Sequence, residues 1–188
     1  MHPGLVLIGL WLAWAISWVI AARWSSKALH VEGGRAVMIY RLLMLIGGLI
    51  LAVPARTSWA VHLWWPSFTG AWLCVLGAFA GFAFCWWARL HLGSLWSGSV
   101  TIKADHHIVD TGPYGLVRHP IYSGLIVALL ATALIKGTLV GLIGVAVILA
   151  GIVMKARLEE NVLRGDLGPQ AYDAYARRVP MLVPFWRS

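Results

Sequence analysis

Two polar segments of this 188-residue chain carry most of the side chains that could bind a charged ligand. The first covers residues 89–120 and leads into the stretch GPYGLVRHPIYSG at 112–124. The second covers residues 155–188 and begins with a pair of carboxylates, Glu159 and Glu160. Charged groups beside long apolar runs are costly unless they contact water, each other or a ligand. Because loops on a rigid scaffold commonly carry binding sites, both segments are candidates for a functional site.

Metal binding is one chemistry that these residue types suggest. Three histidines of the first segment, His106, His107 and His119, have side chains of the kind that bind metals. However, the chain has no HExxH or CxxC arrangement, and adjacent histidines rarely bind one ion together. We therefore predict no metal site. The phosphate-binding patterns GxxxxGK[ST] and GxGxxG are also absent, and no serine has the sequence context of a hydrolase nucleophile.

Long apolar runs must position the two polar segments. The chain is 60% hydrophobic and only 12% charged, with a mean hydropathy of +0.78. Since about 20 apolar residues cross a bilayer, we predict an all-α integral membrane bundle of about five spanning helices. Their expected positions are residues 4–22, 36–54, 70–88, 120–135 and 138–156. Lys136-Gly137 separates the last two, because a charge followed by glycine is typical of a tight turn. We expect a single domain, residues 1–188.

Positive charge is unequally divided between the two sides of this predicted bundle. Twelve Lys and Arg residues fall on the side of the polar segments and two, Arg56 and Lys136, on the other, while Arg41 stays inside the second span. Cytoplasmic loops are enriched in Lys and Arg, so we expect an outer N-terminus and a cytosolic C-terminus. Contact with anionic membrane lipid then explains the net charge of +8, and we predict no nucleic-acid partner.

Several other polar and aromatic residues are expected to have structural roles. Arg41 is expected to snorkel to the interface or to find an internal partner. The tyrosines at 172 and 175 are expected to pack the tail against the membrane surface. Spacing of three and four places three tryptophans on one face of the first helix, which favours helix packing over an aromatic ligand site. These are Trp11, Trp14 and Trp18.

Taken together, the two polar segments resemble the isoprenylcysteine carboxyl methyltransferase family. The matching features are LGSLWS at 92–97, His106 to Tyr114, Arg118-His119-Pro120 with Tyr122, Glu159-Glu160 with Leu163, Gly168 with Tyr172 and Tyr175, Val179-Pro180, and Pro184-Phe185. The first of these resembles an LGxxWS pattern of bacterial members. The resemblance covers about half of the chain, from Leu92 to Phe185. Because separated motifs agree in order and spacing, it is far more specific than a single RHP match.

The resemblance implies methyl transfer from S-adenosylmethionine, with S-adenosylhomocysteine as the product, at the cytosolic face of a membrane such as the bacterial inner membrane. It places the cofactor in a pocket formed by the loop after the third helix and the C-terminal tail. Such a ligand needs an anion, hydrogen-bond donors and apolar or aromatic walls. By position, the cofactor-binding residues would be His106, His107, Ile108, Val109, Tyr114, His119, Pro120, Ile121, Tyr122 and Glu159.

The methyl acceptor is expected to be lipophilic, with a carboxylate such as that of prenylcysteine favoured. In the family, an arginine four residues before the first glutamate helps to hold this carboxylate, whereas this chain has Lys155. Arg157 offers the two aligned donors of a guanidinium and is slightly preferred, although on a helix the two residues point about 200° apart. Catalytic roles are thus expected for Glu159, Arg118 and either Lys155 or Arg157. An NADPH-dependent membrane reductase of the sterol reductase type and a non-enzymatic lipid-binding membrane protein remain as alternatives.

Overall fold

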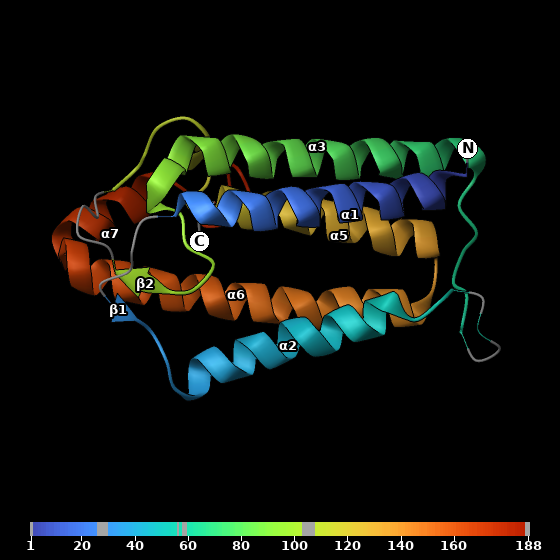
Figure 1. Ribbon diagram of the computed structural model, residues 1–188, viewed down its shortest axis with the longest axis horizontal. Coiled ribbons are helices and arrows are strands. Elements are labelled where there is room, and N and C mark those ends of the chain that lie inside the picture. Colours follow the sequence, from blue (N-terminus) through green and yellow to red (C-terminus); the bar gives the residue numbers. More distant parts are fainter. Residues whose placement is uncertain (1, 26–29, 56, 58–59, 103–107, 187–188) are drawn as a thin grey trace.

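The computed structural model of the protein consists almost entirely of helices (Figure 1). It describes residues 2–25, 30–55, 57, 60–102 and 108–186. The elements are α1 (Pro3–Ala21), η1 (Ala22–Trp24), β1 (His30–Val31), α2 (Arg35–Ala52), α3 (Phe68–Leu92), η2 (Gly93–Leu95), β2 (Thr101–Ile102), α4 (Pro113–Leu116), α5 (Pro120–Lys136), α6 (Leu139–Leu167) and α7 (Pro169–Arg178). The short strands β1 and β2 form an antiparallel pair in which His30 faces Ile102. Apart from this pair, the prediction of an all-α fold is confirmed.

The membrane-spanning character of the bundle lies in its long helices. Four segments are long and apolar enough to cross a membrane: Pro3–Trp24, Arg35–Ala52, Phe68–Leu95 and Leu139–Leu167. Helix α5 is also apolar but has only 17 residues, or about 25 Å of helix against about 30 Å of hydrocarbon. The predicted bundle of about five helices therefore has four of spanning length and one that is shorter.

Local sequence explains where the last two membrane helices begin and end. Helix α5 starts with Pro120 in its first turn and stops at Gly137, whose φ of 61° is left-handed. Glycine adopts this conformation without strain, so the predicted turn is confirmed. Helix α6 begins after Thr138, whose hydroxyl accepts a hydrogen bond from Gly141 N. It continues to Leu167, beyond the apolar run that we expected to end at 156, because Leu, Arg and Glu are good helix formers.

The helices form two layers, with α1, α3 and α5 in one and α2 and α6 in the other (Figure 1). Glycines allow close approach within each layer. A Cβ atom on Gly81 of α3 would lie 2.5 Å from the carbonyl oxygen of Gly124 in α5. Likewise, a Cβ atom on Gly47 of α2 would lie 2.8 Å from the carbonyl oxygen of Gly144 in α6. Each pair of helices therefore packs backbone against backbone.

Both polar segments meet at one end of the bundle, the end that holds α7, β1 and β2 in Figure 1. The start of α5 binds the C-terminal tail through three hydrogen bonds. Arg118 N donates to Pro180 O at 2.8 Å and His119 N donates to Met181 O at 3.1 Å, while Ser123 Oγ donates to Leu182 O at 2.6 Å. Helix α1 begins at the opposite end. Segments more than 40 residues apart in the chain thus form one polar end.

Candidate functional site

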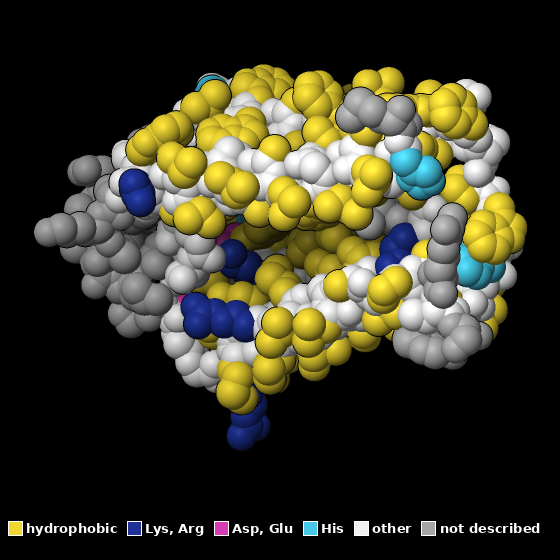
Figure 2. All heavy atoms as spheres, turned by 45° about the vertical axis from the view of Figure 1, so that its right-hand side comes forward, with side chains coloured by type: hydrophobic (Ala, Val, Ile, Leu, Met, Phe, Trp, Pro, Cys, Tyr) yellow, Lys and Arg dark blue, Asp and Glu magenta, His cyan; other side chains and the backbone are white. Residues whose placement is uncertain are grey.

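A cavity of about 500 Å³ lies between the two layers. Its size is typical of a pocket for a small ligand. The lining at the polar end includes Ser97, Gly98, Ser99, Ile108, Val109, Tyr114, Arg118, His119, Pro120, Ile121, Tyr122, Lys155, Glu159, Tyr172 and Tyr175. The apolar lining includes Trp11, Trp14, Trp18, Met44, Leu125, Leu129, Ile148 and Ile152. Figure 2 shows a hollow between the layers with hydrophobic walls, dark blue and magenta side chains at its left and another dark blue side chain at its right.

Glu159 is the only carboxylate among the described residues that line this cavity. Its Oε1 atom accepts a hydrogen bond of 2.7 Å from the Tyr122 hydroxyl and lies 3.7 Å from Lys155 Nζ. Its Oε2 atom lies 3.5 Å from His119 Nδ1, and the Glu159 side chain is 19% exposed. A carboxylate has about four acceptor positions. Glu159 can therefore receive a ligand cation while it keeps these neighbours.

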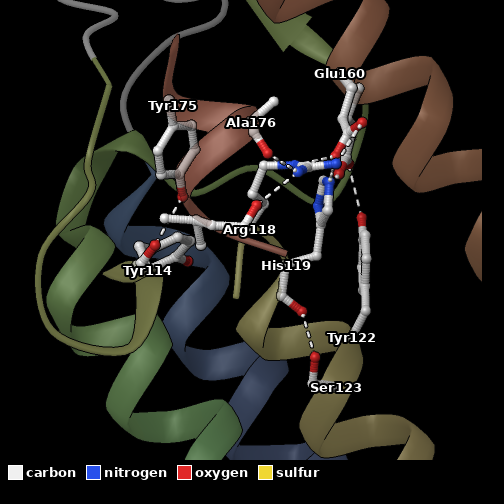
Figure 3. A network of polar contacts seen from close by, with 10 residues as sticks. Tyr114, Arg118, His119, Tyr122, Ser123, Glu160, Tyr175 and Ala176 are labelled. Carbon is white, nitrogen blue, oxygen red and sulfur yellow. Dashed lines mark hydrogen bonds and ion pairs between the residues drawn. The ribbon is translucent and has the colours of Figure 1, made fainter. Parts of the chain in front are cut away.

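The neighbouring carboxylate, Glu160, holds the polar end together (Figure 3). Arg118 donates to it from Nε at 2.7 Å and from Nη2 at 3.2 Å. Arg118 Nη1 donates to the carbonyl oxygens of Ala176 and Val179 at 3.0 and 2.6 Å. His119 Nε2 lies 3.1 Å from Glu160 Oε1. These bonds use most of the donors of Arg118, the residue that we expected to be catalytic, and join the start of α5 to α6 and α7.

Helices α4 and α7 form the wall of the cavity that comes from the loop and the tail. The Tyr175 hydroxyl donates to Tyr114 O at 2.8 Å, and both tyrosines are buried. Burial raises the pKa of Tyr114, which keeps its hydroxyl protonated as a hydrogen-bond donor. Tyr172 and Tyr175 pack against each other and against Ile108, as expected of a packed tail. They also line the cavity, a role that we did not expect.

The segment after α3 forms the opposite wall and depends on a buried arginine that the sequence analysis missed. Arg89 is 1% exposed and donates to Gly93 O at 2.5 Å and to Ala21 O at 2.7 Å. Its guanidinium also lies 4.6 Å from the ring centre of Trp96, and Trp96 lines the cavity. Arg89 thus joins the ends of α1 and α3 to this wall. The position of Arg89 just before the LGSLWS motif could have indicated that it supports this wall of the cavity.

The tryptophans of α1 have two roles. Trp14 stacks on Trp18 and on Phe82 of α3, with ring centres 5.0 and 5.5 Å apart, and Trp11 Nε1 donates to Thr132 Oγ1 of α5 at 3.0 Å. The expected helix packing is therefore present. The same three tryptophans also line the cavity. One face of α1 serves both purposes because the helix borders the opening between the layers.

Most of the residues expected to form the site do line the cavity: Ile108, Val109, Tyr114, Arg118, His119, Pro120, Ile121, Tyr122, Lys155 and Glu159. His106 and His107 lie outside the described residues. Lys155 is only 8% exposed and donates to Gly98 O at 2.8 Å. Arg157, the slightly preferred cation, is exposed and is not part of the lining. The structure therefore places the lysine at the cavity, because two positions on α6 turn the arginine away.

The fold and the site together define a small helical membrane protein whose cavity joins a charged end to an apolar channel. Residues 72–164 match the sequence model of the isoprenylcysteine carboxyl methyltransferase (ICMT) family. The chain is also 30% identical over 125 residues to protein-S-isoprenylcysteine O-methyltransferase B of Arabidopsis thaliana. This match spans 65% of the chain and 61% of the length of the relative. The resemblance seen in the two polar segments is thereby confirmed.

Proposed function

We propose that this protein is an S-adenosylmethionine-dependent methyltransferase that acts on a lipophilic acceptor. One observation carries this proposal: a single cavity joins the carboxylate of Glu159 and its polar neighbours to an apolar channel between membrane helices. The polar end suits a small charged cofactor and the channel suits a hydrocarbon chain. The match to a methyltransferase family supports the same conclusion.

The residues at the polar end fit the chemistry of this cofactor. Glu159 offers a negative charge for an ammonium group, and the buried hydroxyl of Tyr114 offers a hydrogen-bond donor. Ile108, Val109 and Ile121 supply apolar surface for a flat ring. When bound, S-adenosylmethionine supplies an electrophilic methyl group on a sulfonium sulfur. We therefore assign the cofactor to this end of the cavity.

The acceptor is assigned to the side of the cavity near Lys155. The ammonium of Lys155 has three donors, of which one binds Gly98 O and another faces Glu159. A remaining donor can bind an acceptor carboxylate, such as that of a prenylcysteine. The prenyl chain would then lie along Met44, Ile148 and Ile152 towards the tryptophans of α1.

Catalysis by these residues requires alignment rather than acid–base chemistry, since a carboxylate is already ionised at neutral pH. Lys155 would hold the acceptor carboxylate with one oxygen directed towards the cofactor site, and Glu159 would fix the cofactor. The apolar walls exclude water and thus remove part of the hydration that weakens a carboxylate nucleophile. Positioning of this kind is one of the larger sources of rate enhancement.

The same proposal assigns an orientation in the membrane. Five cations lie at the polar end, on α6, on α7 or just before α5: Arg118, Lys155, Arg164, Arg177 and Arg178. Because such residues favour the cytoplasmic side, the polar end would face the cytosol, as of a bacterial inner membrane, and the N-terminus would lie outside. A soluble cofactor would then enter from the cytosol and a lipid acceptor from the membrane.

Two measurements on purified protein in neutral detergent test this function. Calorimetric titration compares S-adenosylhomocysteine, S-adenosylmethionine and NADPH as ligands. Transfer of a labelled methyl group is then measured to a prenylcysteine with a free carboxylate, to its methyl ester as a blocked control, and to a hydrophobic thiol. We expect binding of the two adenosyl ligands and labelling of the free carboxylate only.

The other outcomes separate the alternatives. Binding of NADPH without S-adenosylhomocysteine would indicate a reductase, and binding of neither would indicate a lipid-binding protein. Labelling of the thiol but not the carboxylate would retain the methyltransferase and change the acceptor.

A further inference from the structure

A cation outside the cofactor end lies beside the cavity. Arg41 is the seventh residue of α2 (Arg35–Ala52), is exposed, and donates from Nη2 to Ser99 Oγ at 3.4 Å. Ser99 lines the cavity, as does Met44, which follows Arg41 by one helical turn. Arg41 is therefore on the flank of α2 that borders the cavity. In Figure 2, dark blue side chains occur both inside the hollow and on its lower edge.

Arg41 and Lys155 lie at the same level of the bundle. Lys155 Nζ lies 5.9 Å from the ring centre of Tyr40, the residue before Arg41. It donates to the carbonyl of Gly98, and Arg41 donates to the hydroxyl of the next residue, Ser99. Adjacent residues of one loop thus hold one cation inside the cavity and one at its edge.

Few contacts of the described residues stabilise the charge of Arg41 in its apolar helix. Among the residues that the structure describes, its hydrogen-bond partner is a neutral hydroxyl at a long distance, and no described carboxylate forms an ion pair with it. A charged side chain within a membrane helix is costly and commonly marks the path of a substrate or an ion. The burial of Lys155 at 8% exposure, against the exposure of Arg41, makes Arg41 the cation that an approaching anion would meet first.

The surfaces around Arg41 favour an amphiphilic anion that enters the cavity. Across the opening, α1 contains no charged residue and presents Trp14 and Trp18 to the cavity. On its other side, Arg41 borders a groove that also contains Glu32. An anion that carries a hydrocarbon chain can therefore bind Arg41 through its charged group while its chain contacts the apolar wall of the cavity.

We propose that Arg41 is the docking site for the anionic group of the acceptor at the membrane opening of the cavity, ahead of Lys155. This proposal rests on the proposed function, because it specifies how that acceptor is recognised. Arg41 acts here in binding and specificity, while Lys155 and Glu159 remain with the reacting groups.

The test is a binding experiment that does not depend on methyl transfer. An N-acetyl-S-prenylcysteine and its neutral carboxamide are each titrated into protein in uncharged detergent, with quenching of tryptophan fluorescence as the signal. Wild type is compared with Arg41→Gln, with the charge-retaining Arg41→Lys, and with Arg35→Gln. The last removes an exposed cation of the same helix that, unlike Arg41, lines neither the cavity nor the neighbouring groove. Circular dichroism melting confirms that each variant is folded.

We expect Arg41→Gln to weaken binding of the acid roughly five- to tenfold, as for a lost and partly exposed charged hydrogen bond. Binding of the carboxamide should not change, Arg41→Lys should retain most of the affinity, and Arg35→Gln should have no effect. Added salt should weaken binding of the acid to wild type more than to Arg41→Gln.

Three outcomes would overturn the proposal: no binding of the acid to wild type, equal losses for the acid and the carboxamide, or equal effects of Arg35→Gln and Arg41→Gln. Should Arg41→Gln fail to fold, Arg41→Met, which also removes the charge, takes its place with the same expected results. Acid binding through Arg41 without any methyl transfer would instead disprove the proposed function, and Arg41 would then be a binding site for an amphiphilic anion that is not a methyl acceptor.

Discussion

Replacement of Glu159 by glutamine is the most direct test of the cofactor end. Glutamine keeps an oxygen that can accept the 2.7 Å hydrogen bond from the Tyr122 hydroxyl, so the local packing should persist. The substitution removes only the negative charge. A charge-assisted hydrogen bond contributes about 1.5–3 kcal/mol, which corresponds to a loss of about 10- to 150-fold in the affinity for S-adenosylhomocysteine.

The surroundings of Glu159 place the expected loss in the lower part of this range. Lys155 Nζ lies 3.7 Å from the Glu159 carboxylate and already offsets part of its charge before a ligand binds. The side chain is also 19% exposed, and water weakens the attraction between charges. We therefore expect a loss of about 10- to 30-fold.

The assay is calorimetric titration of S-adenosylhomocysteine into wild type and Glu159→Gln, with thermal unfolding measured on the same samples. Unchanged affinity in a protein with a wild-type melting curve would refute the assignment of the cofactor to this end. The matched control is Glu160→Gln, which weakens the bonds from Arg118 and His119 and should lower the melting temperature more than Glu159→Gln does.

Two further predictions concern the acceptor and the packing of the layers. Lys155→Ala should raise the KM of a carboxylate acceptor about tenfold or more. Arg157→Ala changes an exposed residue and should leave this KM unchanged. Equal effects of the two variants in a methyl transfer assay would contradict the assignment of Lys155. Gly81→Ala should cost about 1–3 kcal/mol by overpacking, because the new Cβ would lie 2.5 Å from Gly124 O, whereas Gly77→Ala has open space and should be neutral or stabilising. Thermal unfolding in detergent measures both glycine variants, and a similar loss in the two would disprove the close-packing argument.

Local features of the sequence were sufficient to predict the helical elements. Apolar runs predicted the membrane helices. The Lys136-Gly137 pair predicted the turn between α5 and α6, since glycine adopts the left-handed conformation found there without strain. The extension of α6 to Leu167 was not expected as part of the same helix. Hydropathy reports the membrane boundary, whereas helix propensity decides where the helix stops.

The assembly of the site was less accessible to sequence analysis. The family resemblance predicted that the loop and tail meet, but the choice between Lys155 and Arg157 depends on which face of α6 points to α2, and a sequence without an alignment does not show this. The tryptophans of α1 posed a similar problem, because spacing identifies a shared face and not what covers it. Gly81 and Gly77 are both glycines inside the apolar helix α3, and the sequence does not tell them apart. Only the position of α5 shows that Gly81 has no room for a side chain.

The arrangement of contacts explains why a cavity persists in an otherwise closely packed bundle. Within each layer, glycine contacts bring α3 against α5 and α2 against α6. Polar bonds join the layers at both ends. Arg118 pairs with Glu160 at one end, and at the other Lys136 of α5 donates to the carbonyls of Leu51 and Val53 at the C-terminal end of α2. The layers also pack together through Leu129 of α5 and Val145 of α6. These links hold the two layers together at both ends and along α5 and α6, but they do not join α1 to α2. The layers therefore stay apart on the side where α1 faces α2. A lipid-like acceptor would therefore reach Lys155 through an opening that the fold itself maintains.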